Sequence, residues 1–318
     1  MPAGQEIYFP QRLGLKRKTV IIPRTSSIGW VLLSAFCFAS MGALSHDAAA
    51  SSGWLGVVFA RAFVNFLFVA ALAIVTSKPL ILFAAPKNLW VRSITGTCSM
   101  FGTFYAFTHL PIAEAICISN TTPIWMALLV SFMTRMSLSY SVWAGVACGT
   151  IGVVLVQQPE FQQGNLAIIA GLGGGFFGAI AVYNLHLVKN IHPTTIVAHF
   201  SLIASIASFL AMLPSLYAAP WGTGWTVPVF LKLIGVGAMG TVGQLAMTRG
   251  YITGDPAINA IVALAQVAFG AGFDILIWER SFDPASIIGI ILITSPTLFF
   301  VVEQRLVHQR KRIPAAVK

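Results

Sequence analysis

Polar side chains recur at matching positions in two long apolar stretches of the chain. Glu114 and Thr121 lie seven residues apart in the first stretch, and Asn259 and Gln266 lie seven apart in the second. A spacing of seven places both members of each pair on one face of a helix. A carboxylate inside an apolar segment costs free energy, so it is expected only where it has a function. These four residues are therefore candidate ligands of a polar substrate.

The two stretches are copies of one segment. Moving 145 residues along the chain takes Pro111 to Pro256 and Arg135 to Arg280 without a gap, and it also superimposes the two polar pairs. Membrane proteins built from such internal repeats bind their substrates near the bilayer midplane, between the two copies. The duplication therefore predicts a shared central cavity.

Other residues extend this candidate site. Trp125 lies one turn after Thr121 on the same face, where its flat ring could stack on a substrate. Tyr105, Tyr183 and Gln244 are further substrate-binding candidates within apolar segments. Glu114 is also the candidate for proton coupling, because an acid held at membrane depth can carry a proton.

Arg61 lies about two turns into another apolar segment. Its long side chain could extend to the membrane surface while the stem stays in the apolar region. Alternatively, it could face inward as the counter-charge of a carboxylate or of an anionic substrate. The sequence leaves both interpretations open.

Composition assigns the chain to a membrane. Of its 318 residues 57% are hydrophobic and 9% are charged, and the mean hydropathy is +0.83. A soluble protein of this length could not bury so much apolar surface, so the lipid bilayer is the expected partner. The basic pI of about 9.8 does not indicate nucleic-acid binding, because the basic clusters lie at the two chain ends.

Ten apolar segments have the length of membrane-spanning helices. Their ranges are 29–46, 54–76, 89–108, 112–134, 140–157, 165–188, 194–217, 229–250, 257–278 and 284–303. With both termini in the cytoplasm, 16 of the 19 lysines and arginines, Arg92 among them, lie in or next to cytoplasmic segments. That asymmetry predicts cytoplasmic termini and requires an even number of spans.

The segment 165–188 contains a glycine-rich run over 171–178. Small residues at this density allow a helix to pack tightly against its neighbours. The alternative is that the absence of side chains at these glycines leaves space where this helix forms the wall of a cavity.

The spans divide into two halves of five. We expect a basic N-terminal tail over 1–28, a first repeat over 29–158, a second repeat over 164–303 and a basic C-terminal tail over 304–318. Because five is odd, the second repeat crosses the membrane in the opposite direction to the first. Inverted repeats suit transport by alternating access around a central site.

The chain resembles the EamA branch of the drug/metabolite transporter superfamily. The residues that carry the resemblance are Leu110–Ala115, Thr248–Tyr251, Gln266–Val267, Trp278–Arg280 and Ala35–Ala43. The resemblance implies an all-α fold of ten helices in two inverted repeats, with a cavity lined by spans one, three, four, six, eight and nine. It also implies a small-molecule substrate without naming it. The chain departs from the family at Thr134-Arg135, where members commonly end the repeat with Gly-Glu.

We therefore predict a secondary transporter of a small polar or amphipathic metabolite, driven by protons or by exchange, in the bacterial inner membrane. A membrane scaffold or sensor is the alternative from another class. An intramembrane hydrolase is disfavoured, because Asp255 and Asp274 lie about five turns apart, ~28 Å along one helix, and cannot share a proton. The sequence contains no metalloprotease or serine-hydrolase motif and no metal-ligand spacing among its four cysteines, so we expect no enzyme activity, cofactor or metal.

Overall fold

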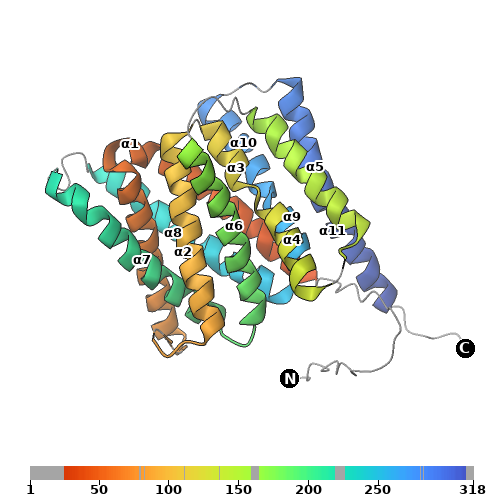
Figure 1. Cartoon of the computed structure of the whole chain (residues 1–318), viewed down its shortest axis with the longest axis horizontal. Helices are drawn as coiled ribbons and strands as arrows, with labels where there is room; N and C mark the ends of the chain where they lie inside the picture. Colours follow the sequence, from red (N-terminus) through yellow and green to blue (C-terminus); the bar gives the residue numbers. More distant parts are fainter. Residues whose placement is uncertain are drawn as a thin grey trace, which may run out of the picture.

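The computed structural model describes residues 25–78, 80–81, 83–110, 112–135, 137–158, 165–218, 226–279, 281 and 283–312. All regular structure in these ranges is helical (Figure 1). The helices are α1 (Thr25–Val75), α2 (Lys87–His109), α3 (Ile112–Ser119), α4 (Thr122–Thr134), α5 (Tyr140–Gln157), α6 (Asn165–Leu187), α7 (Pro193–Ala218), α8 (Val227–Thr253), α9 (Pro256–Ala263), α10 (Ala265–Trp278) and α11 (Pro284–Arg312).

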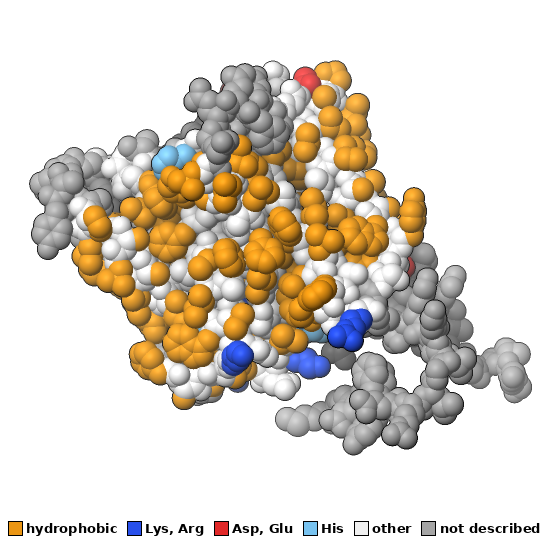
Figure 2. Space-filling model, in the orientation of Figure 1, with side chains coloured by type: hydrophobic (Ala, Val, Ile, Leu, Met, Phe, Trp, Pro, Cys, Tyr) orange, Lys and Arg blue, Asp and Glu red, His pale blue; other side chains and the backbone are white. Residues whose placement is uncertain are grey.

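Within the described residues, nine helical stretches are long and apolar enough to cross a membrane. Apolar side chains cover the face of the molecule shown in Figure 2, as expected of a surface in contact with lipid. The chain is therefore a multi-pass membrane protein. The predicted third span is α2, which is 23 residues long but less apolar than the others. It packs along α6 and α7, and this burial explains how a more polar helix is accommodated.

The first two predicted spans meet at one residue. A loop is expected between them from the sequence, but the first helix continues through Ser52 and changes direction at Gly53, where φ is 69° and ψ is 161°. This backbone conformation is open almost exclusively to glycine, since a side chain would clash with the backbone. Gly53 therefore sets the angle between the two halves of α1.

The fourth and ninth predicted spans are each interrupted. The first interruption separates α3 from α4 just before Pro123, which lacks an N–H and cannot continue the hydrogen-bonding of the preceding turn. The second interruption, at Leu264, has no proline; there the Leu264 N–H donates to Ile261 O at 3.1 Å, a tighter turn than an α-helix. Both repeats thus carry a break at equivalent positions.

Close helix packing depends on glycine. The helices α5 and α11 lie side by side at the right of Figure 1. A Cβ placed on Gly152 would come within 2.7 Å of Gly289 O, so these backbones touch. At the α2–α6 contact, the Ser99 hydroxyl donates to Gly174 O at 2.7 Å. Small residues of this kind allow helices to approach closely in lipid.

Replacing Gly53 by alanine should destabilise the protein by about 1–3 kcal/mol, because alanine is strained at this φ and ψ. The melting temperature in detergent, followed by tryptophan fluorescence, measures the loss. Gly29→Ala is the matched control, since Gly29 lies on the same helix and a Cβ placed on it would have no atom within 4 Å. Equal melting temperatures for the two variants would contradict the assigned role of Gly53.

Gly174→Ala should cost about 1–3 kcal/mol through overpacking. A Cβ there would lie 3.0 Å from Thr103 N and 3.2 Å from Ser99 O, both backbone atoms that move only with α2 itself. The neighbouring Gly173 has no such contact within 4 Å, so Gly173→Ala should leave thermal stability unchanged or slightly raised. Similar losses for both variants would argue against a tight α2–α6 contact.

Candidate functional site

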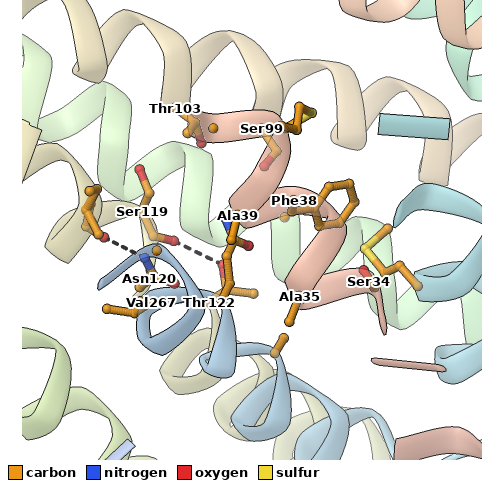
Figure 3. Close-up of a pocket in the computed structure, with 18 of the residues that line it drawn as sticks. Ser34, Ala35, Phe38, Ala39, Ser99, Thr103, Ser119, Asn120, Thr122 and Val267 are labelled. Atoms are coloured by element: carbon orange, nitrogen blue, oxygen red, sulfur yellow. Dashed lines mark hydrogen bonds between the residues drawn. The ribbon is translucent and has the colours of Figure 1, made fainter. Parts of the chain in front are cut away.

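A cavity of about 830 Å³ lies between the two halves of the chain. This volume is within the range of small-molecule binding sites. Its lining comes from all helices α1 to α10, together with the turns that interrupt the two broken helices. Figure 3 shows part of this wall, with Ala35, Phe38 and Ala39 of α1 facing Ser99 and Thr103 of α2 and Val267 of α10.

The two ends of the cavity differ. At one end it is bounded by Val182, Tyr251 and Ala260, which belong to a large packed cluster that also includes Ile28 and Val188. At the other end its lining reaches Ala49 and Trp54 beside the Gly53 kink of α1, Gln157 at the end of α5 and Asp274 near the end of α10. The cavity is therefore separated by packed side chains from the end of the molecule at which α1 begins.

The break between α3 and α4 supplies polar groups to the wall. Ser119, Asn120 and Thr122 all line the cavity (Figure 3). The Asn120 Nδ2 donates to Ile116 O at 2.9 Å, and the Thr122 hydroxyl donates to Ser119 O at 3.3 Å. The Thr122 bond satisfies Ser119 O, whose helical partner would be the N–H that Pro123 lacks, whereas Ile116 O also accepts the ordinary helical bond from Asn120 N at 3.0 Å.

Three lining residues carry buried polar atoms without a hydrogen-bond partner among the described residues. They are Arg92 Nε, Ser119 Oγ and Gln244 Oε1. A buried polar atom left in that state costs about 1–3 kcal/mol. A donor, a hydroxyl and an acceptor are thus available to a ligand or to water in the cavity.

Both arginines of the wall are held by aromatic rings. The Arg92 guanidinium carbon lies 4.2 Å from the centre of the Phe200 ring, and that of Arg61 lies 5.9 Å from Phe38 and 5.7 Å from Phe104. Such cation–π contacts hold the charged group against an apolar wall.

Of the two interpretations of Arg61, the structure supports the inward one, because Arg61 lines the cavity. Arg92, counted from the sequence among the cytoplasmic charges, also belongs to the wall, where only 2% of it is exposed. The sequence feature that could have indicated a place in the wall is the position of Arg92 inside an apolar segment, one turn before Gly96.

Two of the predicted substrate-binding residues line the cavity. Gln244 of α8 is buried, with its side-chain carbonyl unpaired among the described residues. Gln266 of α10 follows the second helix break and is partly buried. Their amides enter the site from the second repeat.

Thr121 and Trp125 lie outside the lining, behind the first helix break. The Thr121 hydroxyl donates to Ile118 O at 2.7 Å and accepts a bond from Trp125 Nε1 at 3.2 Å. The indole packs edge-on against Phe176, with ring centres 5.4 Å apart. In this conformation both side chains stabilise the turn that presents Ser119 and Asn120.

Asn259, Tyr105 and Tyr183 also lie outside the lining. Asn259 is fully buried, and its Nδ2 donates to Gly250 O at 2.9 Å, which ties α9 to α8. Tyr105 stacks on His109, with ring centres 4.0 Å apart, and meets the cavity residue Trp54 edge-on. Tyr183 packs against the large core cluster.

The remaining candidate, Glu114, has its backbone in α3, and its side chain lies outside the described residues. Asp255, considered above as a hydrolase residue, is the N-cap of α9: its carboxylate accepts from the N–H groups of Ala257 and Ile258 at 2.8 and 3.1 Å. Within the described part of the chain, no three histidine, cysteine or acidic side chains gather as metal ligands.

Comparison with curated proteins identifies several transporters. The chain is 24% identical over 274 residues to the pseudopaline exporter CntI of Pseudomonas aeruginosa (strain UCBPP-PA14), covering 84% of this chain and 93% of the relative. It is 19% identical over 288 residues to the S-adenosylmethionine uptake transporter of Rickettsia bellii, covering 89% and 96%. A riboflavin transporter of Vibrio cholerae is 27% identical over 154 residues, covering 46% of this chain and 48% of the relative.

A solved structure shares the fold, with a TM-score of 0.75 at 15% identity over 89% of this chain and 99% of that chain. The model of the EamA-like transporter family matches twice, over residues 25–157 and 165–302. These two matches span nearly all of the described helices. The chain therefore belongs to the EamA-like transporter family.

Proposed function

We propose that the protein is a secondary transporter that moves a small polar or amphipathic metabolite across the bacterial inner membrane by alternating access. The observation that carries the proposal is the cavity of about 830 Å³ with unpaired polar atoms in the described part of its wall, lying between two copies of one family unit. Such a site, enclosed by helices from both repeats, can be exposed to each side of the membrane in turn.

The proposed architecture is ten spans in two inverted repeats of five. It counts α2 as a span and joins α3 with α4, and α9 with α10. Helix contacts support this arrangement: α1 packs against α8 and, at equivalent positions, α6 packs against α2. The first helix of each repeat thus contacts the third helix of the other. An odd number of spans per repeat makes the second copy run oppositely.

Both termini are placed in the cytoplasm, in accordance with the positive-inside rule. Lysine and arginine side chains gather along the lower edge of the molecule in Figure 2, below the apolar band, which supports that orientation. The packed cluster that bounds one end of the cavity includes Ile28, near the start of α1. In this topology the cavity is therefore closed towards the cytoplasm, as in an outward-facing conformation.

The relatives support a metabolite substrate without identifying it. Pseudopaline, riboflavin and S-adenosylmethionine are the substrates given in the names of three relatives, and those names include both an exporter and an uptake transporter. Similarity to these relatives therefore supports a small-molecule substrate but does not identify it or the direction of transport.

Flux in proteoliposomes tests the function. Vesicles containing the protein and loaded with a soluble-metabolite extract should exchange at least one labelled metabolite faster than empty vesicles, detected by mass spectrometry. Gln244→Ala and Gln266→Ala should each lower that flux about tenfold, the effect of losing one or two hydrogen bonds to the substrate. Asn190→Ala, at an exposed turn, is the control. Absence of protein-dependent flux would instead favour a scaffold or sensor.

Proton coupling through Glu114 is a separate proposal. Glu114→Gln removes the ionisable group but keeps its size and polarity, so flux should persist and lose its dependence on pH. The measurement is initial flux against external pH for both proteins. If the variant keeps the pH profile of the unmodified protein, Glu114 does not carry the proton. A flat profile in both proteins would indicate exchange without protons.

A further inference from the structure

We propose that the transported molecule is an organic anion whose acidic groups, such as carboxylate, phosphate or sulfonate, bind the guanidinium groups of Arg61 and Arg92. This inference rests on the proposed transport function and specifies the class of its substrate. Both arginines line the same cavity, from the second half of α1 and from α2. The proposal follows from the charge of the wall and from the way each guanidinium is held.

The wall carries more positive than negative charge. Among the described lining residues, Arg61 and Arg92 are basic, and Asp274 is the acidic residue. Charges in a cavity between helices interact more strongly with one another and with a ligand than charges in water, because the surrounding helices have a low effective dielectric. A cavity with a net positive wall favours an anion over a neutral or cationic molecule of the same shape.

Arg92 has the features of a binding group. Only 2% of its surface is exposed, yet its Nε lacks a hydrogen-bond partner among the described residues. A buried guanidinium that serves only to stabilise a fold is expected to be paired with an acid or with carbonyls. The absence of a side chain at Gly96 makes room for it, since a Cβ there would lie 2.7 Å from Arg92 Nη1.

The aromatic contacts orient both arginines. The guanidinium carbon of Arg92 lies over the Phe200 ring, and that of Arg61 lies near the Phe38 and Phe104 rings. An attraction to a ring face does not use the guanidinium N–H groups as hydrogen-bond donors to oxygen, so they remain available to acceptors along the edge of the group. That edge matches the paired oxygens of a carboxylate or phosphate, which accept two parallel hydrogen bonds.

The remainder of the wall suits the rest of such a molecule. Ser119 Oγ and Gln244 Oε1 are unpaired within the described residues and can bind hydroxyl or amide groups. Trp54, Met100 and Val267 supply apolar surface. The cavity thus accepts a molecule with an anionic head and a mixed polar and apolar body.

The test uses a metabolite extract of the expression host, separated by ion exchange into anionic, neutral and cationic pools. Each pool is loaded into proteoliposomes at zero membrane potential, and protein-dependent exchange is followed by mass spectrometry. We expect exchange from the anionic pool, at least tenfold above that from the other two. Exchange confined to the neutral or cationic pool would overturn the inference and leave the transport function intact. No exchange from any pool would overturn both.

Arginine variants connect the selectivity to these two residues. Arg61→Gln and Arg92→Gln should each lower anion exchange at least tenfold. Arg249→Gln is the matched control, because Arg249 also lies over an aromatic ring, Trp30 at 4.8 Å, but is not part of the cavity wall. Variants that remain monodisperse and keep full anion exchange would overturn the assignment. The pool experiment on the unmodified protein remains decisive if a variant fails to fold.

Discussion

Backbone polar groups inside a membrane must be hydrogen-bonded within the protein or face a water-accessible cavity, and this constraint explains the construction of the central site. Lipid offers no hydrogen bonds, so the helix breaks can exist only where side chains or a cavity satisfy the freed groups. At the α3–α4 break, the Thr122 hydroxyl donates to Ser119 O, the carbonyl to which Pro123 cannot donate because it has no N–H. Both breaks lie on the cavity wall rather than on the lipid-facing surface.

Glycine contacts keep the helices close enough to enclose this site. Gly174 and Gly178 of α6 belong both to the cavity wall and to the contact with Ser99 of α2. A glycine at such a position serves two purposes, because it allows the backbones to approach and leaves volume for a ligand. From the sequence alone, tight packing and a thin cavity wall are alternative roles for the glycine-rich run of α6. In the structure, Gly174 and Gly178 have both roles.

The two arginines give the site its chemical character. Cation–π contacts with Phe38, Phe104 and Phe200 offset part of the cost of holding charge at membrane depth. If the substrate is an anion, as proposed, its binding would offset the remaining cost, and substrate binding would be linked to the stability of the cavity.

Residue types and spacing by themselves determined the membrane class, the internal duplication and the places where the helices lie. The apolar runs, the shift that relates Pro111 to Pro256 and the proline at position 123 are features of the chain itself, so they can be recognised without coordinates.

The direction in which each polar side chain points was decided by tertiary structure. Gln244 and Gln266 face the cavity, whereas Asn259 binds Gly250 of α8. Arg92 is counted among the cytoplasmic charges from the sequence alone, but in the structure it is buried in the cavity wall against Phe200 of α7. A spacing of seven residues shows which side chains share one face of a helix. Only the neighbouring helices decide whether that face contacts a ligand, another helix or lipid.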